Sequence, residues 1–186
     1  MTPLFFKEIA NAHEKKDYSN LKYLYLRYSR LFFFISSFCS VFVIYKIEFI
    51  ISTIIGSEYL DAVIPASIYL IYPIHQSVGQ LNGVFLLATE KTKVVRNLLI
   101  FISTIGMPLT YVLLSKNKIL FFHGFNLGAL GISIKMVSVQ MISVVIQTWI
   151  IAKFLKVRKT PLFLHQIIVL AILTSIIGLF YNIEKT

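Results

Sequence analysis

The stretch LFFFISSFCSVFVIYKIEFIISTII, residues Leu31–Ile55, is almost continuously apolar. Four more apolar stretches follow it along the chain, at Ala62–Ala88, Leu98–Ser115, Leu127–Ala152 and Leu162–Tyr181. Each is close to the roughly 20 residues that an α-helix needs to cross a bilayer core. Because backbone groups in lipid must form their hydrogen bonds within the segment, these stretches predict helices. The expected fold is therefore all-α, a polytopic transmembrane helix bundle with about five spans.

The composition favours a membrane protein and argues against a nucleic-acid binder. Hydrophobic residues make up 57% of the 186-residue chain and charged residues 14%, against roughly 25% charged residues in a soluble domain. The net charge of +10 is distributed over the loops and does not form one continuous face. Loop charge of this kind is typical of segments that contact anionic lipid headgroups. The expected partner is the lipid bilayer, and nucleic acid is not expected.

Lysine and arginine between the apolar stretches predict how the chain is threaded. The segments expected on the other, non-cytoplasmic side of the membrane hold only Lys46, Lys116, Lys118 and Lys185. Cytoplasmic loops carry an excess of positive charge, so the N-terminus and the second and fourth loops are expected in the cytoplasm and the C-terminus outside. The basic residues of these three cytoplasmic regions are Lys7, Lys15, Lys16, Lys22, Arg27, Arg30, Lys91, Lys93, Arg96, Lys153, Lys156, Arg158 and Lys159.

Residues 1–30 are expected to form a cytoplasmic connector, followed by a transmembrane domain over residues 31–182 and a short tail at 183–186. Within the connector, Asp17–Arg30 is amphipathic, with an aromatic and leucine side opposite a basic side. Asp17 is well placed as the N-cap of this helix. A basic amphipathic helix is typical of a segment at the lipid headgroups. A soluble connector helix is the alternative.

Several residues are expected to interrupt the spanning helices. Lys46 falls about 22 Å into the first span, near the outer interface, where its aliphatic stem can snorkel. Ile47–Ile55 would then run along the outer leaflet until Gly56 turns the chain. Pro73 and Pro108 lie inside apolar stretches and are expected to kink their helices.

Polar residues inside predicted spans are costly in lipid, so each suggests a function. The second span carries a cluster that follows one helical face and cannot favourably face lipid. The cluster either lines a water-filled cavity, or its glycines let another helix approach while its amides bond across the contact. Its members are His75, Gln76, Gly79, Gln80, Asn82 and Gly83.

The fourth span contains Lys135 and a second polar stripe on a different face of the helix. Lys135 lies about a third of the way in from the outer end, so it either attracts an anion or snorkels outward. The stripe is rotated by well over 100° from Lys135, so the two cannot point into the same narrow pore. It consists of Ser133, Gln140, Ser143 and Gln147.

The sequence does not suggest an enzyme. It has no spaced His, Cys and carboxylate set for a metal, no glycine-rich phosphate loop and no nucleophile elbow. The acidic residues fall in loops or at the edges of spans, so general acid–base catalysis within the membrane is not expected. We expect no metal and no cofactor.

The order of motifs resembles that of bacterial polysaccharide flippases of the O-antigen (Wzx-like) type. TPLFFKEIANAHEKKDYSNLKYLYLRYSR (Thr2–Arg30) resembles their cytoplasmic connector, and IISTIIGSEYLDAVIPASIYLI (Ile50–Ile71) resembles their G-x-x-Y-x-x-A turn. LLATEKTKVVRNLL (Leu86–Leu99) is similar to their short basic loop. NLGALGISIKMVSVQMIS (Asn126–Ser143) is similar to the glycine-rich start of their twelfth helix.

The resemblance implies the multidrug/oligosaccharidyl-lipid/polysaccharide exporter superfamily, whose fold has two six-helix lobes around a central cavity. The first four spans match helices nine to twelve and the fifth an additional helix, so the chain corresponds to the C-terminal part of a flippase. The implied partners are a lipid-linked oligosaccharide and an N-terminal lobe or a second copy. The implied location is the inner (cytoplasmic) membrane.

The implied function is the flipping of an undecaprenyl-diphosphate-linked O-antigen or capsule repeat unit. On this interpretation Lys135 attracts the diphosphate or an acidic sugar. The other candidate substrate-binding residues are His75, Gln76, Gln80, Asn82, Gln140 and Gln147. The alternatives are a drug or cation antiporter of the same superfamily, which would need an acidic residue in its cavity, and a non-transporting membrane subunit or assembly partner.

Overall fold

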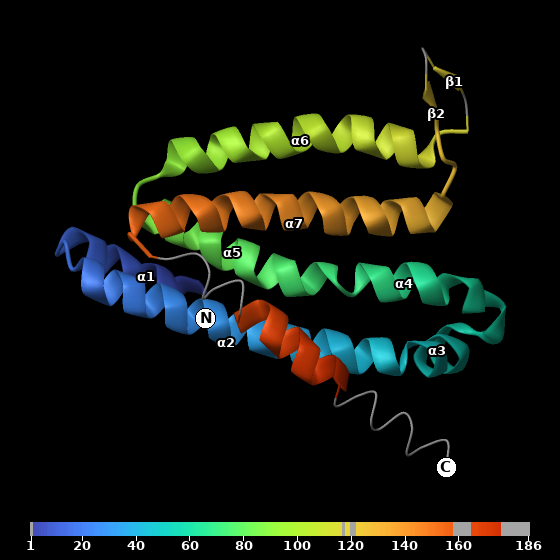
Figure 1. The fold of residues 1–186 in the computed structure, drawn as a ribbon, viewed down its shortest axis with the longest axis horizontal. Coiled ribbons are helices and arrows are strands. Elements are labelled where there is room, and N and C mark those ends of the chain that lie inside the picture. Colours follow the sequence, from blue (N-terminus) through green and yellow to red (C-terminus); the bar gives the residue numbers. More distant parts are fainter. Residues whose placement is uncertain (1, 117, 120–121, 158–164, 176–186) are drawn as a thin grey trace.

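The computed structural model describes residues 2–116, 118–119, 122–157 and 165–175, and these are helical apart from short connections and one small hairpin (Figure 1). The hairpin pairs β1 (Lys118–Ile119) with β2 (Phe122–His123) in antiparallel fashion. The helices are α1 (Thr2–Glu14), α2 (Tyr18–Tyr45), α3 (Ile47–Ile50), α4 (Val63–Tyr69), α5 (Tyr72–Ala88), α6 (Thr92–Leu114), α7 (Gly128–Phe154) and an unlabelled helix at His165–Ser175.

Three helices among the described residues, α2, α6 and α7, are long and apolar enough to cross a membrane. The predicted all-α fold is therefore confirmed, with three helices that could cross a membrane by their length and composition, whereas the count of five spans is not confirmed. The second apolar stretch is divided between α4 and α5, so neither part reaches spanning length alone. Of the fifth stretch, the described part is the shorter apolar helix His165–Ser175, and the remainder lies outside the described residues.

Asp17 begins α2, as the sequence predicted. Its Oδ1 accepts hydrogen bonds from the backbone N–H of Asn20, at 3.0 Å, and from the Ser19 hydroxyl, at 2.7 Å. These donors favour the charged carboxylate and lower the pKa of Asp17. The helix then runs through Arg30 without interruption and ends at Tyr45. The amphipathic segment and most of the first apolar stretch are thus one continuous helix.

The chain reverses direction between Lys46 and Ala62. Lys46 separates α2 from α3, so the first helix ends at Tyr45 and not at Ile55. A π-helical turn at Ile51–Ile55 leads to Gly56, whose φ of +128° favours glycine. The predicted turn at Gly56 is present, and a 3₁₀ turn at Ser57–Ala62 connects it to α4.

The two internal prolines have different effects. Pro73 sits in the first turn of α5, and the helix is broken just before it, at residues 70–71. The proline has no N–H to continue the ladder, and its ring crowds the carbonyl four residues earlier, which accounts for the break. Pro108 lies inside α6, which continues through it as one helix to Leu114.

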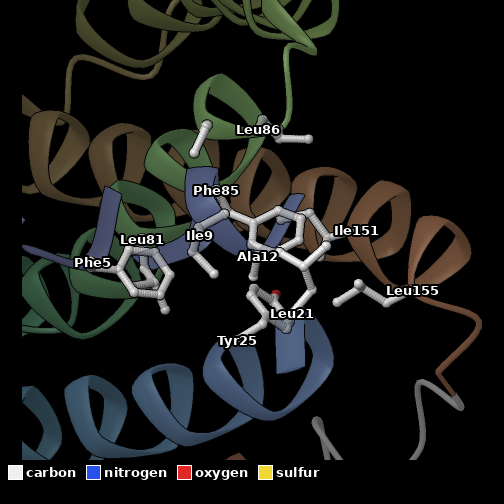
Figure 2. Packing of buried hydrophobic residues seen from close by; sticks show 11 residues of the cluster. Phe5, Ile9, Ala12, Leu21, Tyr25, Leu81, Phe85, Leu86, Ile151 and Leu155 are labelled. Atoms are coloured by element: carbon white, nitrogen blue, oxygen red, sulfur yellow. The ribbon is translucent and has the colours of Figure 1, made fainter. Parts of the chain in front are cut away.

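The helices pack in layers, with α7 lying between α6 and the remaining helices (Figure 1). The main core joins α1, α2, α5 and α7 (Figure 2). Phe5 and Ile9 of α1 are 2% and 0% exposed, so part of the predicted connector belongs to the core. The cluster consists of Phe5, Ile9, Ala12, Leu21, Tyr25, Leu81, Phe85, Leu86, Ala88, Ile151 and Leu155.

Phe154, at the end of α7, brings three basic segments together at one end of the molecule. The Nζ atom of Lys91, before α6, lies 4.2 Å from the centre of the Phe154 ring. The rings of His13 and Tyr18, on either side of the α1–α2 junction, lie 6.3 and 6.2 Å from it. The three segments with predicted cytoplasmic charge therefore share one end, at the left of Figure 1.

Candidate functional site

A cavity of about 330 Å³ lies between α5, α6 and α7. Two of its walls carry polar side chains, and the third is entirely apolar. Its lining consists of Gln76, Gly79, Gln80, Gly83, Val84, Leu86 and Leu87 from α5, Val95, Leu98, Leu99 and Ile102 from α6, and Gln140, Ser143 and Gln147 from α7.

The α5 wall is built from the polar stripe that the sequence indicated. Gln76, Gly79, Gln80 and Gly83 follow a spacing of three and four residues, which places them on one side of the helix. The side-chain amides of Gln76 and Gln80 form no hydrogen bond with any other described residue. This wall therefore offers free donors and acceptors to a ligand.

The α7 wall contains three of the four residues of the second predicted stripe. The fourth, Ser133, is buried outside the lining, and its hydroxyl donates to the backbone oxygen of Ala129 at 3.1 Å. Gln140, Ser143 and Gln147 are spaced by three and four residues and face the same cavity. The Gln147 Nε2 donates to Oγ of Ser143 at 3.2 Å. The Gln147 Oε1 is buried and accepts no hydrogen bond from the described part of the chain. A buried carbonyl oxygen without a donor is costly, so this atom reduces the stability of the site in the absence of a ligand.

The α6 wall is apolar and was not identified from the sequence. Val95, Leu98, Leu99 and Ile102 recur at helical spacing. Such spacing is found on any apolar helix face, so it gave no signal that distinguishes a cavity wall from core or lipid contact.

The sequence suggested that the α5 stripe either lines a cavity or lets another helix approach closely. Each interpretation applies at a different glycine. A Cβ on Gly79 would lie 2.6 Å from Nε2 of Gln140 and 3.1 Å from Cγ2 of Val144, so Gly79 permits close approach of α5 and α7. A Cβ on Gly83 would meet no atom within 4 Å. Gly83 thus leaves open space at the cavity, whereas Gly79 allows α5 and α7 to pack closely together.

Asn82 does not line the cavity, although the sequence suggested it as a substrate-binding residue. It is fully buried, with an exposed fraction of 0%. Its Oδ1 accepts from the hydroxyl of Tyr25 at 2.9 Å, and its Nδ2 donates to Oγ1 of Thr148 at 3.0 Å. Both ends of the amide are used to connect α2, α5 and α7, so Asn82 holds the bundle together.

Lys135 and His75 also lie outside the cavity lining. A Cβ on Gly106 would lie 3.8 Å from Cε of Lys135, so the lysine stem passes α6 at a glycine. Helical spacing places Lys135 on a different side of the α7 axis from Gln140 and Gln147. His75 is partly buried beside Gln76 but does not face the same space.

The site brings together Gln76, Gln80, Gln140 and Gln147 among the suggested residues. Its polar groups are neutral amides and one hydroxyl, which can hydrogen-bond a polar ligand. No group of three or more His, Cys, Asp or Glu residues that could hold a metal ion is found among the described residues. Comparison with protein-family models, curated proteins and solved structures finds no match for this chain.

Proposed function

We propose that this chain takes part in flipping an undecaprenyl-diphosphate-linked oligosaccharide, an O-antigen or capsule repeat unit, across the cytoplasmic membrane. The observation that supports this is the amide-lined cavity, set between helices two of which are long enough to span a bilayer. A cavity of hydrogen-bonding groups at membrane depth gives sugar hydroxyls partners that lipid lacks. The polyprenyl tail would remain in the bilayer. The proposed role is transport and not catalysis.

The proposed orientation places the N-terminus and the basic end of the bundle in the cytoplasm. The convergence of the α1–α2 junction, the segment before α6 and the end of α7 on Phe154 supports this, because all three would face one side. Residues Leu86, Leu87 and Val95 place the cavity toward that end. Sugar would therefore enter from the cytoplasmic side.

We further propose that an N-terminal lobe or a second copy of the chain completes the translocation path. Alternating access in such transporters comes from the movement of one helical bundle against another. The core around Tyr25, Phe85 and Ile151 would move as one of these bundles.

A cation antiporter is less well supported, because its cavity needs a carboxylate. The described lining contains none. A non-transporting assembly partner would contain the same cavity without using it, so a transport assay distinguishes this alternative.

The test is flipping of a fluorescent lipid-linked oligosaccharide in proteoliposomes that contain the chain with its partner lobe or as a homodimer. We expect the variant Gln76→Leu/Gln140→Leu to reduce the flipping rate at least tenfold. Gln166→Leu, on the helix His165–Ser175 and outside the cavity lining, is the matched control and should leave the rate unchanged.

Equal rates for the cavity variant and the wild type would contradict the proposal. A wild type that does not flip the lipid under either condition would favour the assembly-partner alternative.

A further inference from the structure

We propose that the cavity accepts electrically neutral sugar units and excludes units that carry a carboxylate or phosphate. The inference rests on the proposed function in that it takes the ligand to be a sugar. It names the substrate class from the chemistry of the lining alone. It also replaces the expectation that Lys135 attracts an anion at the same site.

The lining of the cavity offers hydrogen bonds but no charge. The hydrogen-bonding side chains that line the cavity are four glutamines and Ser143, and no charged residue lines it within the described part of the chain. An anion that entered would lose water without gaining a positive partner, which is costly in a low-dielectric site. Lys135 is not among the residues that line the cavity.

The Oε1 atom of Gln147 adds to the unfavourable environment for an anion. This buried atom has almost no accessible surface, and no described residue donates a hydrogen bond to it. An ionised carboxylate or a phosphate dianion in the adjoining cavity has only acceptor oxygens, so it would be repelled by this partial negative charge. A neutral hydroxyl would not meet the same charge repulsion.

The remaining amides of the cavity can both donate and accept hydrogen bonds. Gln76, Gln80 and Gln140 form no hydrogen bond with another described residue. Each presents an NH₂ and a carbonyl oxygen, which together match a hydroxyl as donor and acceptor. The α6 wall, with Leu98 and Ile102, offers an apolar surface to the C–H face of a sugar ring.

The volume limits how much of a glycan enters at one time. About 330 Å³ is at the lower end of the range of small-molecule pockets. The cavity therefore holds only part of a repeat unit at one time. The diphosphate of the carrier lipid stays outside it.

The experiment compares two photoreactive probes that differ only in charge. Both carry an octyl chain with a diazirine next to the glycosidic bond; one headgroup is glucose and the other is glucuronic acid. The full chain is placed in neutral phosphatidylcholine nanodiscs, so that lipid charge does not bias partitioning. Labelled residues are mapped by mass spectrometry.

We expect the glucoside to label cavity-lining peptides at least fivefold more than the glucuronide. Gln140→Leu and Gln147→Leu should reduce glucoside labelling to the level caused by lipid partitioning, while Gln166→Leu should not. Gln80→Lys, at an exposed position, should fold and raise glucuronide labelling by adding a cation. Circular dichroism and size-exclusion profiles establish that each variant is folded.

The outcomes separate this inference from the proposed function. Labelling by the glucuronide that equals or exceeds that by the glucoside would overturn the inference and leave a sugar-binding site in place. Absence of cavity labelling by either probe would overturn the inference and remove the main support for the proposed function.

Discussion

Asn82 shows how a single polar residue can be structural in a position that suggests function. Its amide connects Tyr25 of α2 with Thr148 of α7 in a site with almost no exposure. Within a membrane protein, each such hydrogen bond contributes about 0.6 kcal/mol on average and up to about 1.7 kcal/mol. The loss is larger when a buried partner is left unpaired.

We expect Tyr25→Phe to destabilise the bundle by about 1–2 kcal/mol, because it leaves Oδ1 of Asn82 buried without a donor. Thermal unfolding in detergent, followed by fluorescence, measures the change. Tyr23→Phe is the matched control, since Tyr23 is exposed and its hydroxyl only accepts from Arg27 at 3.3 Å. An equal loss of stability in both variants would show that the buried hydrogen bonds of Asn82 contribute no more to stability than an exposed one.

Gly79 and Gly83 make a second contrast between neighbouring residues. Gly79→Val places branched carbons against Gln140 and Val144, so we expect weaker α5–α7 packing and a displaced Gln140 amide. Gly83→Ala meets open space and should be neutral or stabilising by up to about 1 kcal/mol, because alanine favours the helix. Unfolding temperature and glucoside labelling measure both effects. A Gly79→Val protein that labels and unfolds as the wild type does would refute the close contact.

At the scale of the element, the start of α2 depends on the charge of one side chain. The donors from Asn20 and Ser19 hold the pKa of Asp17 below its ordinary value of about 3.9. A lowered pKa in the folded state means that the cap stabilises the protein above the unfolded pKa. The contribution is lost as the pH falls through the folded pKa.

We therefore expect the difference in unfolding temperature between the wild type and Asp17→Ala to be present at pH 6 and to shrink below pH 4. Asp17→Asn retains a side-chain acceptor for the Asn20 N–H and should cap the helix without this pH dependence. Thermal scans between pH 2.5 and pH 6 provide the measurement. A wild-type advantage that grew toward low pH would have the wrong sign and would contradict the cap.

The elements were predictable where a local signal specified them. The Asp17 cap, the Gly56 turn and the helices α6 and α7 follow from capping chemistry, glycine and apolar length. The burial of α1 was not predictable in this way, because Phe5 and Ile9 find their partners on distant helices. Apolar length alone gave no sign of the break before Pro73, and the signal that predicted an interruption there was the proline itself.

At the scale of the whole molecule, the candidate site was predictable only as two separate stripes. Helical spacing grouped Gln76 with Gln80, and Gln140 with Gln147, and the structure places both pairs around one cavity. Spacing cannot tell which neighbour each face meets. Asn82 turns toward α2 and α7, and Lys135 turns toward α6, for this reason.

The charge distribution of the folded bundle predicts its orientation in the membrane. Three basic segments meet at one end, whereas Glu58 and Asp61 lie exposed in the reversal between α2 and α4. If the basic end is cytoplasmic, as the positive-inside rule requires, Asp61 faces the exterior. The single cysteine, Cys39, is exposed within α2 and must be replaced by serine before labelling.

In that Cys39→Ser background, a membrane-impermeant maleimide should label Asp61→Cys in intact cells. Lys93→Cys and Lys156→Cys should react only after the cells are permeabilised, because both exposed positions belong to the basic end. Labelling of each variant in detergent controls for reactivity. The reverse pattern would place the basic end outside and turn the cavity toward the exterior, so sugar could not enter it from the cytoplasm. Orientation therefore decides whether the cavity serves export, since its position near Leu86 and Val95 determines which side it opens to first.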